Sequence, residues 1–213
     1  MKKGFSKMFA WLFIGLLVTF VVGYGTSSCP IALERMFSGM SSLIVVLLEI
    51  GVAIFFSARL EKMSVTTAKI CYLIYSVITG FTFGLIFLVY ELTSIVMVFL
   101  ATALVFGIFA LIGYFTKRDL SKFGSWLLMS LIAVIIVSIV NIFIASSMLE
   151  LIISIIFIII FLGYIVFDMK NAEGLIEAVG EEKGAIYGAF QLYLDFINLF
   201  IRLLRFLGKI KDN

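Results

Sequence analysis

The strongest candidate for chemistry in this chain is Asp195, near the middle of an apolar stretch from Tyr187 to Leu207. A charge at the bilayer centre costs roughly 2.5–3.5 kcal/mol on insertion scales, so it is rarely there without a role. At about 100° per residue, other polar side chains share an arc of about 80° with it. They are Tyr187, Gln191, Asn198, Arg202 and Arg205. Lipid cannot satisfy such a stripe, so we expect it to line a path for ions or protons.

A second carboxylate, Asp168, ends the preceding apolar run, Leu151–Phe167, and the helix can continue to about Gly174. The connection to the last helix is short, which makes the two helices antiparallel neighbours and can bring Asp168 level with Asp195. Two carboxylates that approach closely cannot both ionise cheaply, so they share a proton. The chain contains no His, so such a pair is its expected way of titrating near neutral pH.

A third carboxylate, Glu49, falls in the middle of another apolar stretch. Buried charges need partners, and we expect Arg202 or Arg205 to pair with it. Arg59, at the end of the same stretch, can extend its side chain towards Asp168, and a contact that breaks on protonation would be a gate. The alternatives are that the carboxylates only hold helices together and that Arg59 only anchors the chain at the interface.

Composition places these residues in a membrane protein. The 213 residues are 63% hydrophobic and 14% charged, with a mean hydropathy of +1.24, whereas soluble domains carry about 25% charge. The apolar stretches are too long for strands and do not alternate, which favours helices over a barrel. The net charge of +3 is dispersed over short loops and indicates no nucleic-acid partner. We predict an all-α membrane protein, a single domain over residues 1–213, with the lipid bilayer as partner.

Seven stretches approach the 20 or so residues that cross a hydrocarbon core. The excess of Lys and Arg in alternate loops predicts a cytoplasmic N-terminus through the first six spans. Arg205, Lys209 and Lys211 break this rule if the seventh span crosses fully, so two alternatives stay open: the last helix crosses late, or it is re-entrant. The predicted spans are Met8–Ser28, Phe37–Ala58, Ala68–Val89, Leu92–Phe115, Phe123–Ala145, Met148–Phe167 and Ala185–Leu207.

The motifs speak against an enzyme. Without His no Ser-His-Asp set exists, and the sequence has no phosphate loop, HExxH, CxxC or haem motif. Intramembrane aspartyl proteases also use two Asp in two spans, within Tyr-Asp and Gly-x-Gly-Asp motifs. Here Asp168 follows Phe167 and Asp195 follows Leu194, so both motifs are missing. We expect neither catalysis nor a cofactor.

Residues 192–200, which read LYLDFINLF and continue to the LLRF of residues 203–206, carry a family resemblance. They resemble the last-helix signature of the Bax inhibitor-1 family, the transmembrane Bax-inhibitor-motif proteins. Three other segments agree with it: residues 117–121 (KRDLS), residues 141–143 (NIF) and Phe167-Asp168. The chain is most similar to the small bacterial members, which implies a prokaryotic plasma membrane.

The resemblance implies a seven-transmembrane-helix bundle with the C-terminal helix central. It implies a pH-sensitive calcium leak in which Asp168 and Asp195 form a proton-sharing sensor, with Arg59 as latch and gate candidate. Calcium would be the transported ion, held transiently by the oxygens of Asp195 and Glu49. Two alternatives remain: a membrane interaction protein that regulates a protease or a cell-death pathway, and a proton-coupled cation exchanger.

Overall fold

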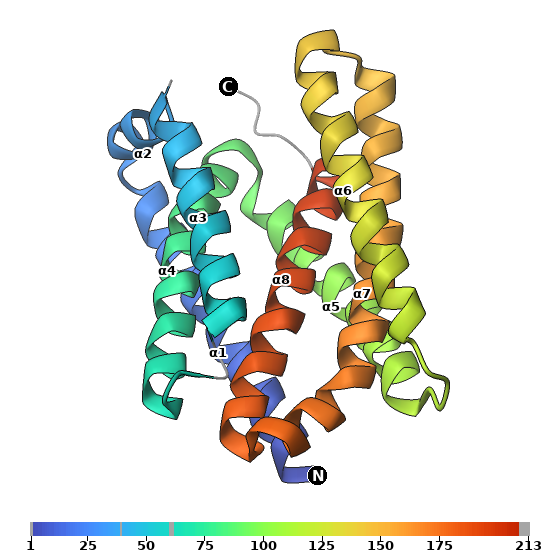
Figure 1. The fold of residues 1–213 in the computed structure, drawn as a ribbon. Coiled ribbons are helices and arrows are strands. Elements are labelled where there is room, and N and C mark those ends of the chain that lie inside the picture. The colour runs from blue at the N-terminus through green and yellow to red at the C-terminus, as the bar shows by residue number, and fades with distance from the viewer. Residues whose placement is uncertain (1, 39, 60–61, 209–213) are drawn as a thin grey trace. The chain divides into compact units, whose positions relative to one another are not determined.

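A computed structural model describes residues 2–38, 40–59 and 62–208, except for the side chains at positions 2, 32, 40–43 and 46. The elements in this part of the chain are α-helices (Figure 1). They are α1 (Lys2–Ser27), α2 (Pro30–Met36), α3 (Met40–Arg59), α4 (Val65–Val89), α5 (Leu92–Phe115), α6 (Ser121–Ile144), α7 (Ser147–Val179) and α8 (Glu181–Leu207). The predicted all-α fold is confirmed.

Six of the described helices are long and apolar enough to cross a membrane: α1, α4, α5, α6, α7 and α8. The second predicted span corresponds to α3, which is 20 residues long and includes side chains outside the described set. The count of seven spans and the central place of the C-terminal helix stay predictions. The largest differences from the predicted spans are that α2 is a separate short helix and that α7 continues past Phe167 to Val179. The helices α1, α4 and α8 begin three to six residues before the predicted spans.

Local chemistry explains where several helices begin and end. Ser64 caps α4, because its hydroxyl accepts a hydrogen bond from the Thr67 amide at 3.1 Å. Pro30 opens α2 at a position where its missing amide hydrogen costs nothing. Gly180, with φ of +89°, separates α7 from α8, as is usual for a residue that ends a helix in the left-handed conformation.

The described chain divides into two compact units. The first unit holds the chain up to Leu92 together with Gly174–Tyr193, and the second holds Thr93–Glu173 with the rest of α8 from Leu194. Both α7 and α8 therefore contribute to each unit. The prediction of a single domain over residues 1–213 stays a prediction.

In the first unit, α1 packs along α4 (Figure 1). The close approach depends on Gly80, because a Cβ atom there would lie 2.6 Å from the Cβ of Val22. Buried aromatic rings fill the space beside these helices, with Phe56 and Phe190 in edge-to-face contact at 4.5 Å between ring centroids. Such aromatic pairs add to the burial of their surface and give this unit a specific core.

In the second unit, α6 lies beside α7 (Figure 1), and the Leu127 side chain meets Gly163. Phe196 of α8 packs against Phe99 and Phe106 of α5, with ring centroids 5.2 and 5.5 Å apart. The helices differ sharply in burial: in an 18-residue apolar stretch of α8, 72% is buried, whereas in the equivalent stretch of α6 only 11% is buried. An apolar helix that buries so little of itself is suited to face lipid.

Candidate functional site

The second unit brings two predicted site residues together. Asp168 of α7 and Asp195 of α8 are buried, with 8% and 4% of their surfaces exposed, and their carboxyl groups lie within hydrogen-bonding reach of each other. Ionised carboxylates only accept hydrogen bonds, so a bond between the two requires a proton on one of them. Oδ2 of Asp195 is buried and has no hydrogen-bond partner among the described residues. The arrangement can therefore hold a proton between two acids and still present a free carboxyl oxygen.

Tyr164 is a neighbour of this pair that the sequence analysis missed. It is half-buried on α7, within electrostatic reach of both Asp168 and Asp195. The signal was its position, since residues four apart lie on the same face of a helix and Tyr164 stands four before Asp168.

Gly113 of α5 allows the close packing next to the pair. A Cβ atom on Gly113 would lie 2.5 Å from the backbone oxygen of Val166 and 3.0 Å from the Cβ of Met169. Val166 and Met169 flank Asp168 in the sequence. The position of Asp168 is therefore sensitive to how closely α5 approaches α7.

The remaining polar residues of α8 have varied environments. Gln191 is half-buried, and Asn198 donates a hydrogen bond from Nδ2 to the Leu194 carbonyl at 2.7 Å. The Arg202 guanidinium lies 3.8 Å from the centroid of the Phe157 ring, a cation–π contact. Arg205 places Nη1 3.8 Å from Oε1 of Glu150. The predicted pairing of Arg202 or Arg205 with Glu49 stays a prediction.

Glu49 forms a separate polar centre in the first unit. It is half-buried on α3, and its carboxylate lies near the hydroxyls of Thr79 and Thr82 on α4. The rings of Tyr75 and Tyr193 are within electrostatic reach of the same carboxylate. The sequence analysis missed both threonines, because threonine is common in membrane helices and its type alone signals no role.

Arg59 is the last residue of α3 and is exposed. Its predicted contact with Asp168 stays a prediction. In the part of the chain that the structure describes, no three His, Cys, Asp or Glu side chains gather as a metal site. The transient calcium positions predicted at Asp195 and Glu49 also stay predictions.

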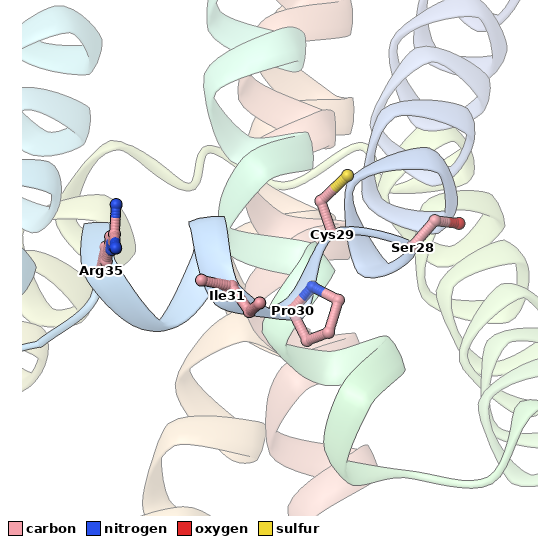
Figure 2. Close-up of a pocket in the computed structure, with 5 residues that line it drawn as sticks. All are labelled: Ser28, Cys29, Pro30, Ile31 and Arg35. Atoms are coloured by element: carbon pink, nitrogen blue, oxygen red, sulfur yellow. The ribbon is translucent and has the colours of Figure 1, made fainter.

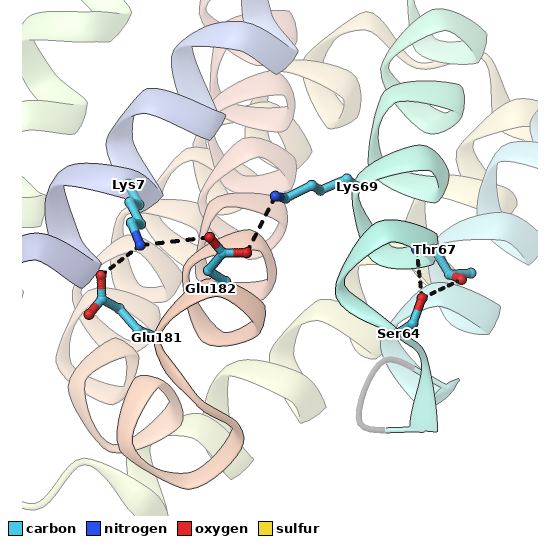
Figure 3. Close-up of polar contacts among 6 residues, drawn as sticks. All are labelled: Lys7, Ser64, Thr67, Lys69, Glu181 and Glu182. Carbon is cyan, nitrogen blue, oxygen red and sulfur yellow. Dashed lines mark hydrogen bonds and ion pairs between the residues drawn. The ribbon is translucent and has the colours of Figure 1, made fainter.

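Exposed charges join three helices at another place in the first unit (Figure 3). Lys7 of α1 lies between two acids at the start of α8, with Nζ 2.8 Å from Glu181 Oε1 and 3.9 Å from Glu182 Oε1. Lys69 of α4 reaches Oε2 of Glu182 at 3.4 Å. Exposed pairs of this kind contribute little stability each.

An open hollow of about 570 Å³ lies where α1 meets α2 (Figure 2). Ser28, Cys29, Pro30, Ile31 and Arg35 line it. None of the predicted site residues is among these five.

Comparisons with known proteins agree with the predicted family. The family model described as "Inhibitor of apoptosis-promoting Bax1" matches residues 1–213. An uncharacterized protein of Borreliella burgdorferi is 38% identical over 218 residues, which cover 100% of this chain and 94% of that protein. The inner membrane protein YbhL of Escherichia coli K12 is 35% identical over 210 residues, covering 95% and 90% of the two chains. The chain is therefore an integral membrane protein that belongs to the Bax inhibitor-1 family.

Proposed function

We propose that this protein is a pH-sensitive calcium leak channel, gated by the proton that Asp168 and Asp195 share. The observation that carries the proposal is the buried approach of these two carboxyl groups, with Oδ2 of Asp195 left unpartnered. A structural pair would be expected to satisfy all of its oxygens, since an unpaired buried oxygen is costly. A free carboxyl oxygen is also the ligand type that calcium prefers.

The gating step follows from the chemistry of two adjacent acids. With one proton between them, a hydrogen bond ties α8 to α7 at this point. Release of that proton to water leaves two negative charges that repel each other, and uptake of a second proton removes the charged acceptor. Either change alters the balance between two packings of α7 and α8, which is the kind of two-state element that gates need. Arg59 is the proposed latch, in a contact that depends on the charge of Asp168.

The proposed setting is a prokaryotic plasma membrane with the N-terminus in the cytoplasm. The distribution of Lys and Arg over the loops supports this orientation. The Escherichia coli relative named as an inner membrane protein supports the location. We propose transport without catalysis and without a bound cofactor.

The test is calcium flux into liposomes that contain an indicator dye, measured with purified protein across about pH 5 to 8. Wild type, Asp168→Asn and Asp195→Asn are compared with empty liposomes, and Asp119→Asn serves as a control outside the membrane spans. The proposal expects flux whose pH dependence is lost in both membrane variants and kept in the control. Folded protein without flux would contradict it.

The family description, which refers to inhibition of apoptosis, favours a second candidate function. In that case the protein acts by binding a membrane partner, such as a regulated protease or a cell-death factor. Absence of flux from purified protein, together with partner-dependent activity, is its expected result. A flux that requires a proton gradient would instead indicate a proton-coupled cation exchanger.

A further inference from the structure

Two buried hydroxyls in the first unit lack the bonds that such groups normally make. Oγ1 of Thr79 and Oγ1 of Thr82 are buried with no hydrogen-bond partner among the described residues, and Thr79 is only 3% exposed. A buried hydroxyl without a partner is costly, and a native structure that keeps one is often explained by a water or an ion at that place. Two such hydroxyls one helical turn apart point to a shared cause.

Other buried hydroxyls show what the ordinary arrangement is. The Ser76 hydroxyl donates to the Tyr72 carbonyl at 3.0 Å and that of Thr102 to the Val98 carbonyl at 2.7 Å, each four residues back on its own helix. The Thr19 hydroxyl donates a hydrogen bond to the Ser76 carbonyl at 3.0 Å and shares another with the Tyr193 hydroxyl. Oγ1 of Thr79 and Oγ1 of Thr82 make neither kind of hydrogen bond among the described residues, although Tyr75 and Tyr193 lie near the Thr79 hydroxyl. The Glu49 carboxylate lies near both hydroxyls but makes no hydrogen bond to either of them among the described residues.

The three groups present oxygen atoms only: two from the carboxylate of Glu49 and one from each threonine. Hard cations such as calcium take carboxylate and neutral oxygens together, and affinity falls as fewer ligands are charged. One carboxylate with two neutral hydroxyls suits a weakly held ion that keeps part of its water. An ion that permeates must be bound in this way, tightly enough to enter and weakly enough to leave.

We propose that Glu49, Thr79 and Thr82 form a coordination site for a divalent cation, with Glu49 as the charged ligand and the two hydroxyls as neutral ligands. The assignment rests on the proposed function, in which calcium is the permeating ion, and adds two ligands on α4 that select for it.

Terbium luminescence tests the site directly. Terbium(III) replaces calcium at oxygen ligands and emits after energy transfer from nearby tyrosine rings, here Tyr75 and Tyr193. Purified wild type is titrated with terbium and then with competing calcium. The test variants are Thr79→Val and Thr82→Val, which remove each hydroxyl but keep the shape of the side chain. Thr79→Ser and Thr82→Ser retain the hydroxyls, and Thr102→Val is the matched buried control in the second unit.

The expected result is calcium-competed emission in wild type, with affinity lower on the order of tenfold in each valine variant. The serine variants and Thr102→Val should bind as wild type does, and all variants should elute as folded protein. Unchanged affinity in both valine variants would overturn the proposal and assign the hydroxyls to ordered water. Wild type without calcium-competed emission would overturn it as well.

The same proteins separate this inference from the proposed function. Wild type that binds terbium but carries no calcium flux contradicts the leak channel and leaves the coordination site standing. Wild type that carries flux, with valine variants that bind terbium normally, contradicts the site and leaves the channel standing.

Discussion

Asp195 and Glu49 are both carboxylates on apolar helices, but different side chains lie next to them. Asp195 lies beside a second acid, Asp168, whereas Glu49 lies beside the neutral hydroxyls of Thr79 and Thr82. An acid beside an acid needs a proton to form a hydrogen bond, so its state depends on pH. An acid beside hydroxyls can accept hydrogen bonds from them without a proton of its own, and its oxygens are of the type that calcium binds. We therefore propose proton sensing for the Asp168–Asp195 pair and cation binding for the centre around Glu49.

The largest expected effect is on the pH dependence of calcium flux, and it comes from removing one acid of the Asp168–Asp195 pair. Asp195→Asn replaces an oxygen that can be charged with an amide that cannot be, so calcium flux should become nearly independent of pH over about pH 5 to 8. Liposome flux at several pH values measures this. Glu49→Gln is the matched control, because it should leave the shape of the pH profile unchanged. A flat profile in both variants would remove the distinction between the two centres.

A substitution at Glu49 should change the size of the calcium flux and leave its pH dependence unaltered. Glu49→Gln removes the charged ligand of its site, so calcium flux should fall on the order of tenfold at every pH. Glu49→Asp keeps the charge and should retain more flux than Glu49→Gln. Equal flux in wild type and Glu49→Gln would show that calcium does not pass this carboxylate.

Two glycine substitutions, one in each unit, test whether pH dependence belongs to the Asp168–Asp195 pair alone. Gly113→Ala and Gly80→Ala each force a Cβ atom into contact with a neighbouring helix, and overpacking of this kind costs about 1–3 kcal/mol. Both variants should lower the thermal unfolding midpoint in detergent. Only Gly113→Ala, which displaces the backbone beside Asp168, should also shift the pH at which flux changes. A shift caused by Gly80→Ala instead would assign pH sensing to the first unit.

The smallest expected effect is on thermal stability and comes from Asp119→Asn. Asp119 lies in the loop before α6 and serves as a reference carboxylate outside the membrane spans. The Ser121 hydroxyl and amide donate to its Oδ1 at 2.5 and 2.9 Å, and these bonds lower the pKa of Asp119. A lowered pKa means that this contribution to stability is present above the pKa of the unfolded chain and is lost as pH falls through the folded value. Asp119→Asn should thus melt slightly below wild type near neutral pH. The difference should vanish in acid, and a difference that persists there would show that the charge is not its cause.

The approach of Asp168 to Asp195 could be predicted from the sequence because a charge in an apolar run is conspicuous. Asp168 and Asp195 stand out, and the short connection between their helices makes them neighbours. Thr79 and Thr82 could not be predicted in the same way. Threonine in a helix usually bonds to its own backbone, and sequence does not reveal which residues depart from that habit.

The helices followed the apolar runs closely, and the exceptions have local causes. The short helix α2 was missed, although Pro30 at its start is a recognised signal. The sixth predicted span ends at Phe167 and its helix was expected to continue to about Gly174, while α7 continues to Val179. Met169, Ala172 and Ile176 explain the extension, because they keep a buried face at helical spacing among the glutamates. Apolar content alone finds a membrane span, but this weaker periodicity decides where its helix stops.

The packing of α1 along α4 has a consequence for synthesis of the protein. The ribosome makes α1 first, yet the surface it covers on α4 emerges only after α2 and α3 have been made. Thr19 of α1 also pairs with Tyr193, near the end of the chain. The first helix must therefore stay in the bilayer with polar atoms unsatisfied until later helices arrive. We expect the insertion machinery to bind such a helix and to cover its polar atoms while translation continues.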